Sequence, residues 1–161
     1  MKIEDIMTRK VITLNSSQTV AEAVDKLAEN GISGAPVVDD DGQVVGILTE
    51  SDILDAIKTR SKRVEMVYPS LSSLSVAFVK KDDLKETLEA FAEIAETPIS
   101  DIMQNDVIYA DKNTDLTAVV EKMNSTGINR VPIMDSGKLV GIVSRADIIK
   151  GLAKVKIVNG D

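Results

Sequence analysis

Two copies of a hydroxyl–carboxylate pair are the residues of this chain best suited to chemistry. Thr49 precedes Asp52 by three positions, and Ser144 precedes Asp147 by the same spacing. A carboxylate accepts hydrogen bonds from two neighbouring hydroxyl groups, so either aspartate can hold the vicinal diol of a ribose. A hydroxyl and backbone N–H groups near the start of a helix suit a phosphate or a ribose oxygen. The alternative for each aspartate is a structural role, in which it stabilises the N-terminus of its helix.

The sequence lacks the residues that most catalytic and metal-binding sites require. The sequence contains no cysteine and no histidine, which excludes thiol nucleophiles, Ser-His-Asp triads and the common zinc sites. Neither the Gly-x-x-x-x-Gly-Lys-Ser/Thr loop nor Gly-x-Gly-x-x-Gly occurs. The acidic run at 39–41 lacks the spacing and the distal glutamate of an EF-hand, so a plain turn is expected. We therefore expect no catalytic residue and no metal site.

The two hydroxyl–carboxylate pairs lie inside a sequence repeat. Residues 3–7, Ile-Glu-Asp-Ile-Met, return at 99–103 as Ile-Ser-Asp-Ile-Met, an offset of 96. Val-Gly-Ile at 45–47 returns at 140–142, where the offset is 95 because the second copy is one residue shorter. Matches that stay in register over about fifty residues indicate an internal duplication.

Each copy reads as strand, helix, strand, strand, helix. In the first copy we expect a strand at 11–14, a helix opened by a Thr19–Glu22 capping box, strands at 36–38 and 44–48, and a last helix from about residue 49. Glycine within the last strand, Gly46 or Gly141, fits close approach by another group. Apolar residues recur at helical spacing in both copies: Val20, Ala23, Val24 and Leu27, then Leu116, Val119, Val120 and Met123.

Residues 59–98 belong to neither copy. Apolar residues alternate loosely in the first half of this insert and indicate a strand or an extended crossing: Leu71, Leu74, Val76 and Phe78. Asp82 or Asp83 is expected to cap an amphipathic helix that ends at Pro98. Its predicted apolar stripe serves core packing or a dimerisation face: Leu84, Leu88, Phe91 and Ala95.

Charge and composition limit the partners. The net charge is −7 and aromatic residues make up 2% of the chain, which disfavours nucleic-acid binding because phosphates need clustered cations and bases need stacking partners. No apolar run is long enough to span a membrane, and the first residues do not form a signal peptide. We expect a cytoplasmic protein.

The segments 46–52 and 141–147 resemble the signature that closes a CBS domain: glycine, two apolar residues, serine or threonine, two variable residues, then aspartate. The Asp-Ile-Met opening, the Gly-Ile before the Pro-Val-type strand and the Asp-Gly hairpin match as well. The resemblance implies an α+β fold made of two pseudo-twofold-related CBS repeats, a tandem pair called a Bateman module. The expected CBS domains are 1–58 and 99–155, with the helical insert at 59–98 and a C-terminal tail at 156–161.

The same resemblance assigns further residues to a ligand. Ile32 and Ile128 stand where CBS domains sandwich an adenine base. Ile12-Thr13 and Ile108-Tyr109 stand where the first strand presents its backbone to the edge of the ring. Ordinary core packing is the alternative for each of them.

The two copies differ in charge near the motif. The second copy has Arg130 and Arg145 where the first has Gly34 and Glu50. Because phosphate prefers guanidinium and is repelled by carboxylate, we predict that the copy with the arginines takes AMP, ADP or ATP. The copy with Glu50 is then empty, or holds a neutral or cationic compound such as S-adenosylmethionine or methylthioadenosine.

The leading hypothesis is a non-catalytic sensor that binds an adenosine compound in the cleft between its two CBS repeats and reports it to an effector protein. No obligatory cofactor is expected. The resemblance also implies a homodimer. The alternative hypothesis is an interaction protein that dimerises and whose ligand pockets are vestigial.

Overall fold

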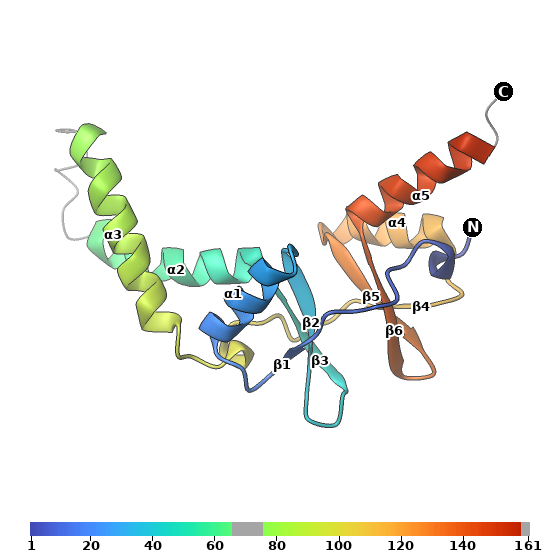
Figure 1. Cartoon of the computed structure of the whole chain (residues 1–161), viewed down its shortest axis with the longest axis horizontal. Helices are drawn as coiled ribbons and strands as arrows, with labels where there is room; N and C mark the ends of the chain where they lie inside the picture. Colours follow the sequence, from blue (N-terminus) through green and yellow to red (C-terminus); the bar gives the residue numbers. More distant parts are fainter. Residues whose placement is uncertain (66–75, 159–161) are drawn as a thin grey trace. The chain divides into compact units, whose positions relative to one another are not determined.

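The computed structural model describes the backbone of residues 1–65 and 76–158, and the side chains of residues 1–60 and 84–155. The chain folds into two compact units, one of which is inserted in the sequence between the two parts of the other. The insert unit runs from Leu14 to Asn105, and the terminal unit combines Met1–Thr13 with Asp106–Asp161. Figure 1 gives the order of the elements in each unit.

The insert unit has a three-stranded sheet in the order β1-β2-β3. The first two strands are parallel, the last two antiparallel, and the register pairs Gly34 with Thr49. Apolar side chains from the sheet, α1 and the start of α2 form one core. Its elements are β1 (Leu14–Asn15), α1 (Val20–Glu29), β2 (Gly34–Val38), β3 (Val44–Thr49), α2 (Glu50–Glu65), α3 (Val76–Ile94) and the short 3-10 helix η2 (Ile99–Asp101).

The terminal unit repeats this plan without the long helical hairpin. Its sheet has the order β4-β5-β6, again parallel and then antiparallel, with Arg130 opposite Ser144. A second core is built from this sheet and its helices. Its elements are η1 (Ile3–Asp5), β4 (Ala110–Asp111), α4 (Leu116–Thr126), β5 (Arg130–Asp135), β6 (Lys138–Ser144) and α5 (Arg145–Val158). The predicted α+β fold and the strand-helix-strand-strand-helix order of both repeats are confirmed.

The opening segment of each sequence repeat packs in the unit that holds the rest of the other repeat. In the terminal unit, Ile3 is fully buried and its N–H donates to the carbonyl of Thr114 at 2.9 Å. In the insert unit, Ile99 is fully buried and its N–H donates to the carbonyl of Gln18 at 2.8 Å. The bounds of the compact units therefore differ from those of the sequence repeats.

An ion pair also ties the N-terminus to the terminal unit. The ammonium group of Lys2 lies 2.8 Å from Oδ1 of Asp115, the residue before α4. The hydrogen bond and the charge of Lys2 lower the pKa of the Asp115 carboxyl below its usual value. Both side chains are largely exposed, so the pair contributes little to stability beside the burial of Ile3.

The two strand glycines lie where the sequence predicts close approach. A methyl group placed on Gly46 would lie 2.5 Å from Sδ of Met103 and 2.9 Å from the carbonyl oxygen of Gln104. A methyl group on Gly141 would collide with the side chain of Met7. In each unit the glycine thus makes room for the methionine that ends the Asp-Ile-Met segment.

The structure of residues 59–98, the insert between the two sequence repeats, differs from its prediction. Helix α3 begins at Val76, so Val76 and Phe78 are helical rather than extended, and Asp82 and Asp83 lie inside the helix instead of capping it. Aspartate in a helix interior costs only a fraction of a kcal/mol relative to alanine, which good helix formers on both sides offset. Leu71 and Leu74 lie outside the described residues.

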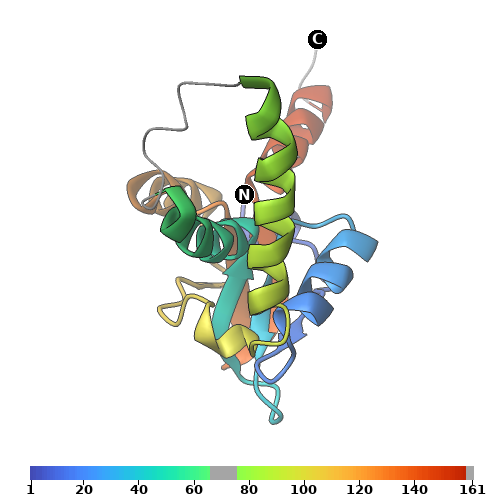
Figure 2. The same ribbon diagram turned by 90° about the vertical axis from the view of Figure 1, so that its left-hand side faces the viewer.

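The buried face of α3 also differs from the predicted stripe. Ala90 and Ile94 are buried and Phe91 is half-buried, whereas Leu84 and Leu88 are 63% and 58% exposed. Helices α2 and α3 pack against each other, as Figure 2 shows, and Arg60 of α2 pairs with Glu93 at 3.3 Å. Only the C-terminal part of α3 reaches the core of the insert unit, which leaves the two leucines in solvent. The first strand is likewise shorter than predicted, because its ladder includes Leu14 and Asn15 alone.

None of the helices in the described ranges has the length and apolarity that a membrane crossing requires.

Candidate functional site

The first hydroxyl–carboxylate pair, Thr49 and Asp52, lies at the start of α2. The N–H and Oγ1 of Thr49 both donate to Oδ2 of Asp52, at 2.9 and 3.2 Å. Helix α2 begins at Glu50, so Asp52 accepts the backbone N–H of the residue just before the helix, as the acidic residue of a capping box does. Asp52 is 8% exposed. We call these residues the Asp52 pair.

The second pair, Ser144 and Asp147, has the same arrangement at the start of α5. The N–H and Oγ of Ser144 donate to Oδ2 of Asp147 at 2.8 and 2.7 Å, and the N–H of Asp147 donates back to Oγ at 3.2 Å. Asp147 is half-buried. We call these residues the Asp147 pair. In both pairs the cap engages one carboxylate oxygen, Oδ2, and leaves Oδ1 for another donor.

A residue that the sequence reasoning missed supplies that donor in the insert unit. Nε2 of Gln104 donates to Oδ1 of Asp52 at 2.8 Å. In the described part of the chain, no corresponding hydrogen bond reaches Oδ1 of Asp147. Extending the repeat alignment by one residue would have given a signal, because Gln104 stands at the position of Thr8 in the first copy.

The two predicted arginines behave differently. Arg130 is the first residue of β5 and pairs in register with Ser144, so it lies beside the Asp147 pair. The side chain of Arg145 instead contacts the end of α4: Nε lies 3.0 Å from Oδ1 of Asn129, and an Nη lies 3.2 Å from the carbonyl of Met123. Its role as a phosphate ligand stays a prediction, one that would require it to leave these acceptors.

The contacts of Arg145 predict a stabilising role. Because guanidinium donors near the end of a helix satisfy its last carbonyls, we expect Arg145→Ala to lower the free energy of unfolding by about 1 kcal/mol. Urea denaturation followed by circular dichroism measures the change. The matched control is Glu50→Ala at the equivalent position of the first repeat. An equal loss in both variants would contradict the assignment.

The residues predicted to surround the base are divided between the units. Ile12, Thr13, Ile108 and Ile128 belong to the terminal unit with the Asp147 pair, whereas Ile32 belongs to the insert unit with the Asp52 pair. All five are half-buried. Ile32 and Ile128 each pack against the core of their own unit. Both therefore make the core contacts that were the alternative to binding a base. Tyr109 is 65% exposed.

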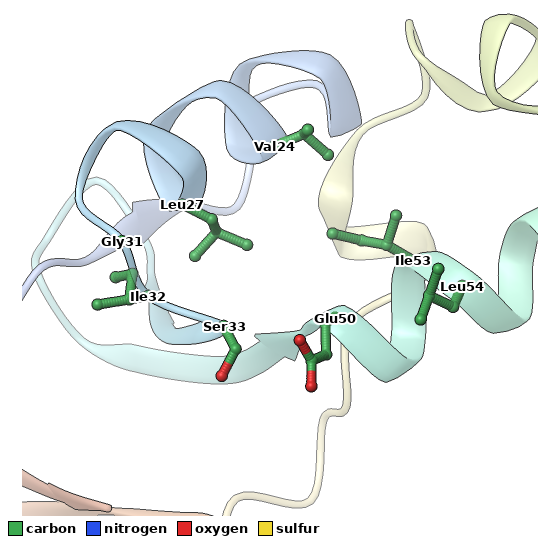
Figure 3. Close-up of a pocket in the computed structure, with 8 residues that line it drawn as sticks. All are labelled: Val24, Leu27, Gly31, Ile32, Ser33, Glu50, Ile53 and Leu54. Carbon is green, nitrogen blue, oxygen red and sulfur yellow. The ribbon is translucent and has the colours of Figure 1, made fainter. Parts of the chain in front are cut away.

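The insert unit contains a cavity of about 540 Å³ between α1 and α2 (Figure 3). Glu50 lies at its edge, and apolar side chains make up most of its wall. Thr49 and Asp52 do not line it, so it is distinct from the Asp52 pair. In the terminal unit the side chain at the position of Glu50 is that of Arg145, which reaches the end of α4. The residues that line the cavity are Val24, Leu27, Gly31, Ile32, Ser33, Glu50, Ile53 and Leu54.

No group of three or more histidine, cysteine, aspartate or glutamate residues is placed to hold a metal ion in the part of the chain that the structure describes.

Comparison with known proteins decides the family. The model of the CBS domain matches residues 3–59 and 99–154, which together include both hydroxyl–carboxylate pairs. The chain belongs to the CBS-domain family. The crystal structure of the CBS domain pair of protein MJ0100, in complex with 5-methylthioadenosine and S-adenosyl-L-methionine, is 25% identical with a TM-score of 0.67, covering 97% of this chain and 98% of that one.

Two curated relatives differ in how much of their own length this chain matches. Protein MJ1426 of Methanocaldococcus jannaschii is 31% identical over 94% of this chain and 91% of its own length. The inosine-5'-monophosphate dehydrogenase of the same organism is 27% identical over 92% of this chain, but over 23% of the enzyme. The chain spans less than half the length of several curated relatives that it matches. The activity of such longer proteins is not transferred by the shared CBS domains.

Proposed function

We propose that this chain is a non-catalytic regulatory module that binds an adenosine compound through its Asp147 pair. The observation that carries the proposal is the geometry of Asp147: Ser144 engages its Oδ2, and no other described residue donates to its Oδ1, which a ligand can therefore use. The 2′- and 3′-hydroxyl groups of a ribose are two adjacent donors, which an ionised carboxylate oxygen with two lone pairs can accept. The adenosine compounds named in the MJ0100 structure support this ligand class.

A phosphorylated adenosine, such as AMP, ADP or ATP, fits the terminal unit best. Arg130 lies beside Ser144 in the sheet register, so a guanidinium group starts from the same end of the sheet as the Asp147 pair. Arginine is suited to phosphate because its planar donors form paired, charge-assisted hydrogen bonds. We assign the phosphate to Arg130 because the register of β5 and β6 places it opposite Ser144.

The insert unit suits an uncharged or cationic adenosine compound. Glu50 occupies the position of Arg145 and would repel a phosphate, whereas the sulfonium of S-adenosylmethionine carries no such penalty. Regulation in either case requires the ligand to bind two states of the protein with different affinities, so that its occupancy shifts the population that a partner meets.

Thermal unfolding in the presence of AMP tests the proposal. A ligand that binds the folded state alone should stabilise the protein by about 2.7 kcal/mol at a hundredfold excess over its dissociation constant. The matched control is 2′-deoxyadenosine 5′-monophosphate, which lacks one hydroxyl of the diol and should stabilise much less at the same concentration. Equal stabilisation by the two compounds would contradict a diol bound by aspartate. No stabilisation by AMP, ADP, ATP or S-adenosylmethionine would contradict an adenosine sensor.

A second candidate is an interaction protein that dimerises through its helices. Leu54 of α2 and Ile149 of α5 occupy equivalent positions of the repeat and are 61% and 66% exposed. Large apolar side chains exposed at matched positions favour a partner surface. For this candidate, light scattering should give the mass of a dimer for the wild type and a lower mass for Leu54→Glu. If adenosine compounds also left thermal unfolding unchanged, only this second candidate would stand.

A further inference from the structure

The residue next to Oδ1 of the aspartate differs between the two units, although its backbone makes the same hydrogen bonds in both. Gln104 and Ile47 exchange two backbone hydrogen bonds, each 2.9 Å long. Thr8 and Ile142 exchange the same two bonds, at 2.9 and 3.0 Å. Ile47 and Ile142 are equivalent residues of the repeat, so Thr8 holds the place in the terminal unit that Gln104 holds in the insert unit.

The side chains at this place have different reach. Gln104 extends its amide to Oδ1 of Asp52 and donates a hydrogen bond of 2.8 Å. Threonine is shorter than glutamine by a methylene and an amide carbon. Within the described residues, Asp147 accepts hydrogen bonds from Ser144, and these reach Oδ2.

Counting acceptor positions shows what this difference does to a diol. An ionised carboxylate has about four acceptor positions. Asp52 accepts three hydrogen bonds, two from Thr49 and one from Gln104, and keeps about one position. Asp147 accepts two, both from Ser144, and keeps about two positions. A vicinal diol donates two hydrogen bonds, so Asp147 can accept both and Asp52 cannot while Gln104 stays in place.

We infer that Gln104 makes the two repeats unequal toward a ribose, in addition to their difference in charge, because its amide competes with the sugar for Asp52. This inference rests on the proposed function. A ribose at Asp52 must first displace the amide from a carboxylate that is 8% exposed, which loses a charge-assisted hydrogen bond. Among the residues that the structure describes, none donates to Oδ1 of Asp147, so a ribose there has no such donor to displace. The first adenosine compound therefore binds at Asp147, and the affinity at Asp52 is about tenfold to a hundredfold weaker.

Gln104 also has a role without ligand. The Asp52 carboxylate is nearly buried, and a buried charge is costly unless it is fully hydrogen-bonded. The amide of Gln104 completes its hydrogen bonds, whereas the half-buried Asp147 has water available for the same purpose. The glutamine thus stabilises the ligand-free state of one repeat, which raises the ligand concentration that this repeat requires.

Exchanging the two residues between the repeats tests the inference. Isothermal titration of the full chain with AMP should show one tight site in the wild type. In Gln104→Thr, which copies the second unit, binding at Asp52 should strengthen at least tenfold. In Thr8→Gln, which copies the insert unit, binding at Asp147 should weaken at least tenfold. Asp52→Asn and Asp147→Asn in each background assign every step of the isotherm to its aspartate.

Further measurements distinguish a failure of this inference from a variant that does not fold and from a failure of the proposed function. Circular dichroism without ligand shows whether each variant folds, and Gln104→Met replaces Gln104→Thr if the latter does not, since it keeps the length and removes the donors. Wild-type binding of AMP with an unchanged isotherm in the folded Gln104 variant and in Thr8→Gln overturns the inference and leaves the proposed function standing. Absence of binding by the wild type and by every variant overturns both.

Discussion

Replacing Ile3 with alanine is expected to destabilise the terminal unit by about 2–5 kcal/mol, which is the usual cost of truncating a buried isoleucine. Ile3 is fully buried in a core whose other members come from residues 116–148 and from Met7. The expected damage therefore appears about a hundred residues away from the substitution in sequence. Hydrogen exchange measured by mass spectrometry should show faster exchange in peptides from 106–155, and little change in peptides from 14–60.

The matched variant is Ile99→Ala, which should have the opposite distribution. Ile99 is fully buried in the insert unit, in a core with Leu14, Val20 and Leu48. Its truncation leaves a cavity in a core whose other buried members, apart from Ile94, lie at positions 14–53, so exchange should rise in peptides from 14–60. Faster exchange in the peptides nearest in sequence, for either variant, would show that each opening segment packs with its own repeat instead.

Local signals predicted the elements of each repeat because their causes are local. The Thr19–Glu22 capping box is present, with Thr19 N–H to Glu22 Oε2 at 3.0 Å and Glu22 N–H to Thr19 Oγ1 at 3.2 Å. The helix faces predicted by spacing are also confirmed: Val20, Ala23 and Leu27, like Leu116, Val119 and Met123, are buried. Spacing predicts a buried face whenever one side of a helix meets a core, whatever the identity of that core.

The partners of these elements depend on distant residues, which one sequence does not display. Nothing in the spacing of residues 3–7 indicates that Ile3 packs in the core of the second repeat. Similarly, the helix that contains Leu84 and Leu88 was predicted, but which of its faces meets α2 was not. The contact of Gln104 with Asp52 spans 52 positions and involves a residue outside the family signature. Only the comparison of one repeat with the other makes that residue visible.

Replacing Asp147 with asparagine is expected to weaken AMP binding about a hundredfold, whereas Asp52→Asn should weaken the tight site by less than threefold. Asparagine keeps the shape of the side chain but removes its charge and turns one acceptor oxygen into an NH₂ donor. The two hydrogen bonds that a ribose donates to Asp147 are charge-assisted, so the loss includes both the acceptors and the charge. Isothermal titration gives both dissociation constants directly.

The effect on the helix must be separated from the effect on the ligand. Both aspartates accept the N–H of the residue before their helix, so both variants should lose about 1 kcal/mol of cap stability without ligand, and Asp52→Asn should lose more because it also disturbs the hydrogen bond from Gln104. A difference between the variants that appears with AMP, and not in its absence, therefore belongs to the ligand. Comparable losses of AMP affinity in both variants would indicate an indirect effect of the helix caps.

Comparing AMP with 2′-deoxyadenosine 5′-monophosphate provides a further test, because a purely structural effect of the substitution would not change the preference between them. If Asp147 binds the diol, removing the carboxylate should abolish the preference for AMP over its 2′-deoxy form, because the discriminating acceptor is gone. In Asp52→Asn the preference should remain as in the wild type. A preference that survives in Asp147→Asn and disappears in Asp52→Asn would place the first ribose in the insert unit, and Gln104 would then be a neighbour that the ligand displaces readily.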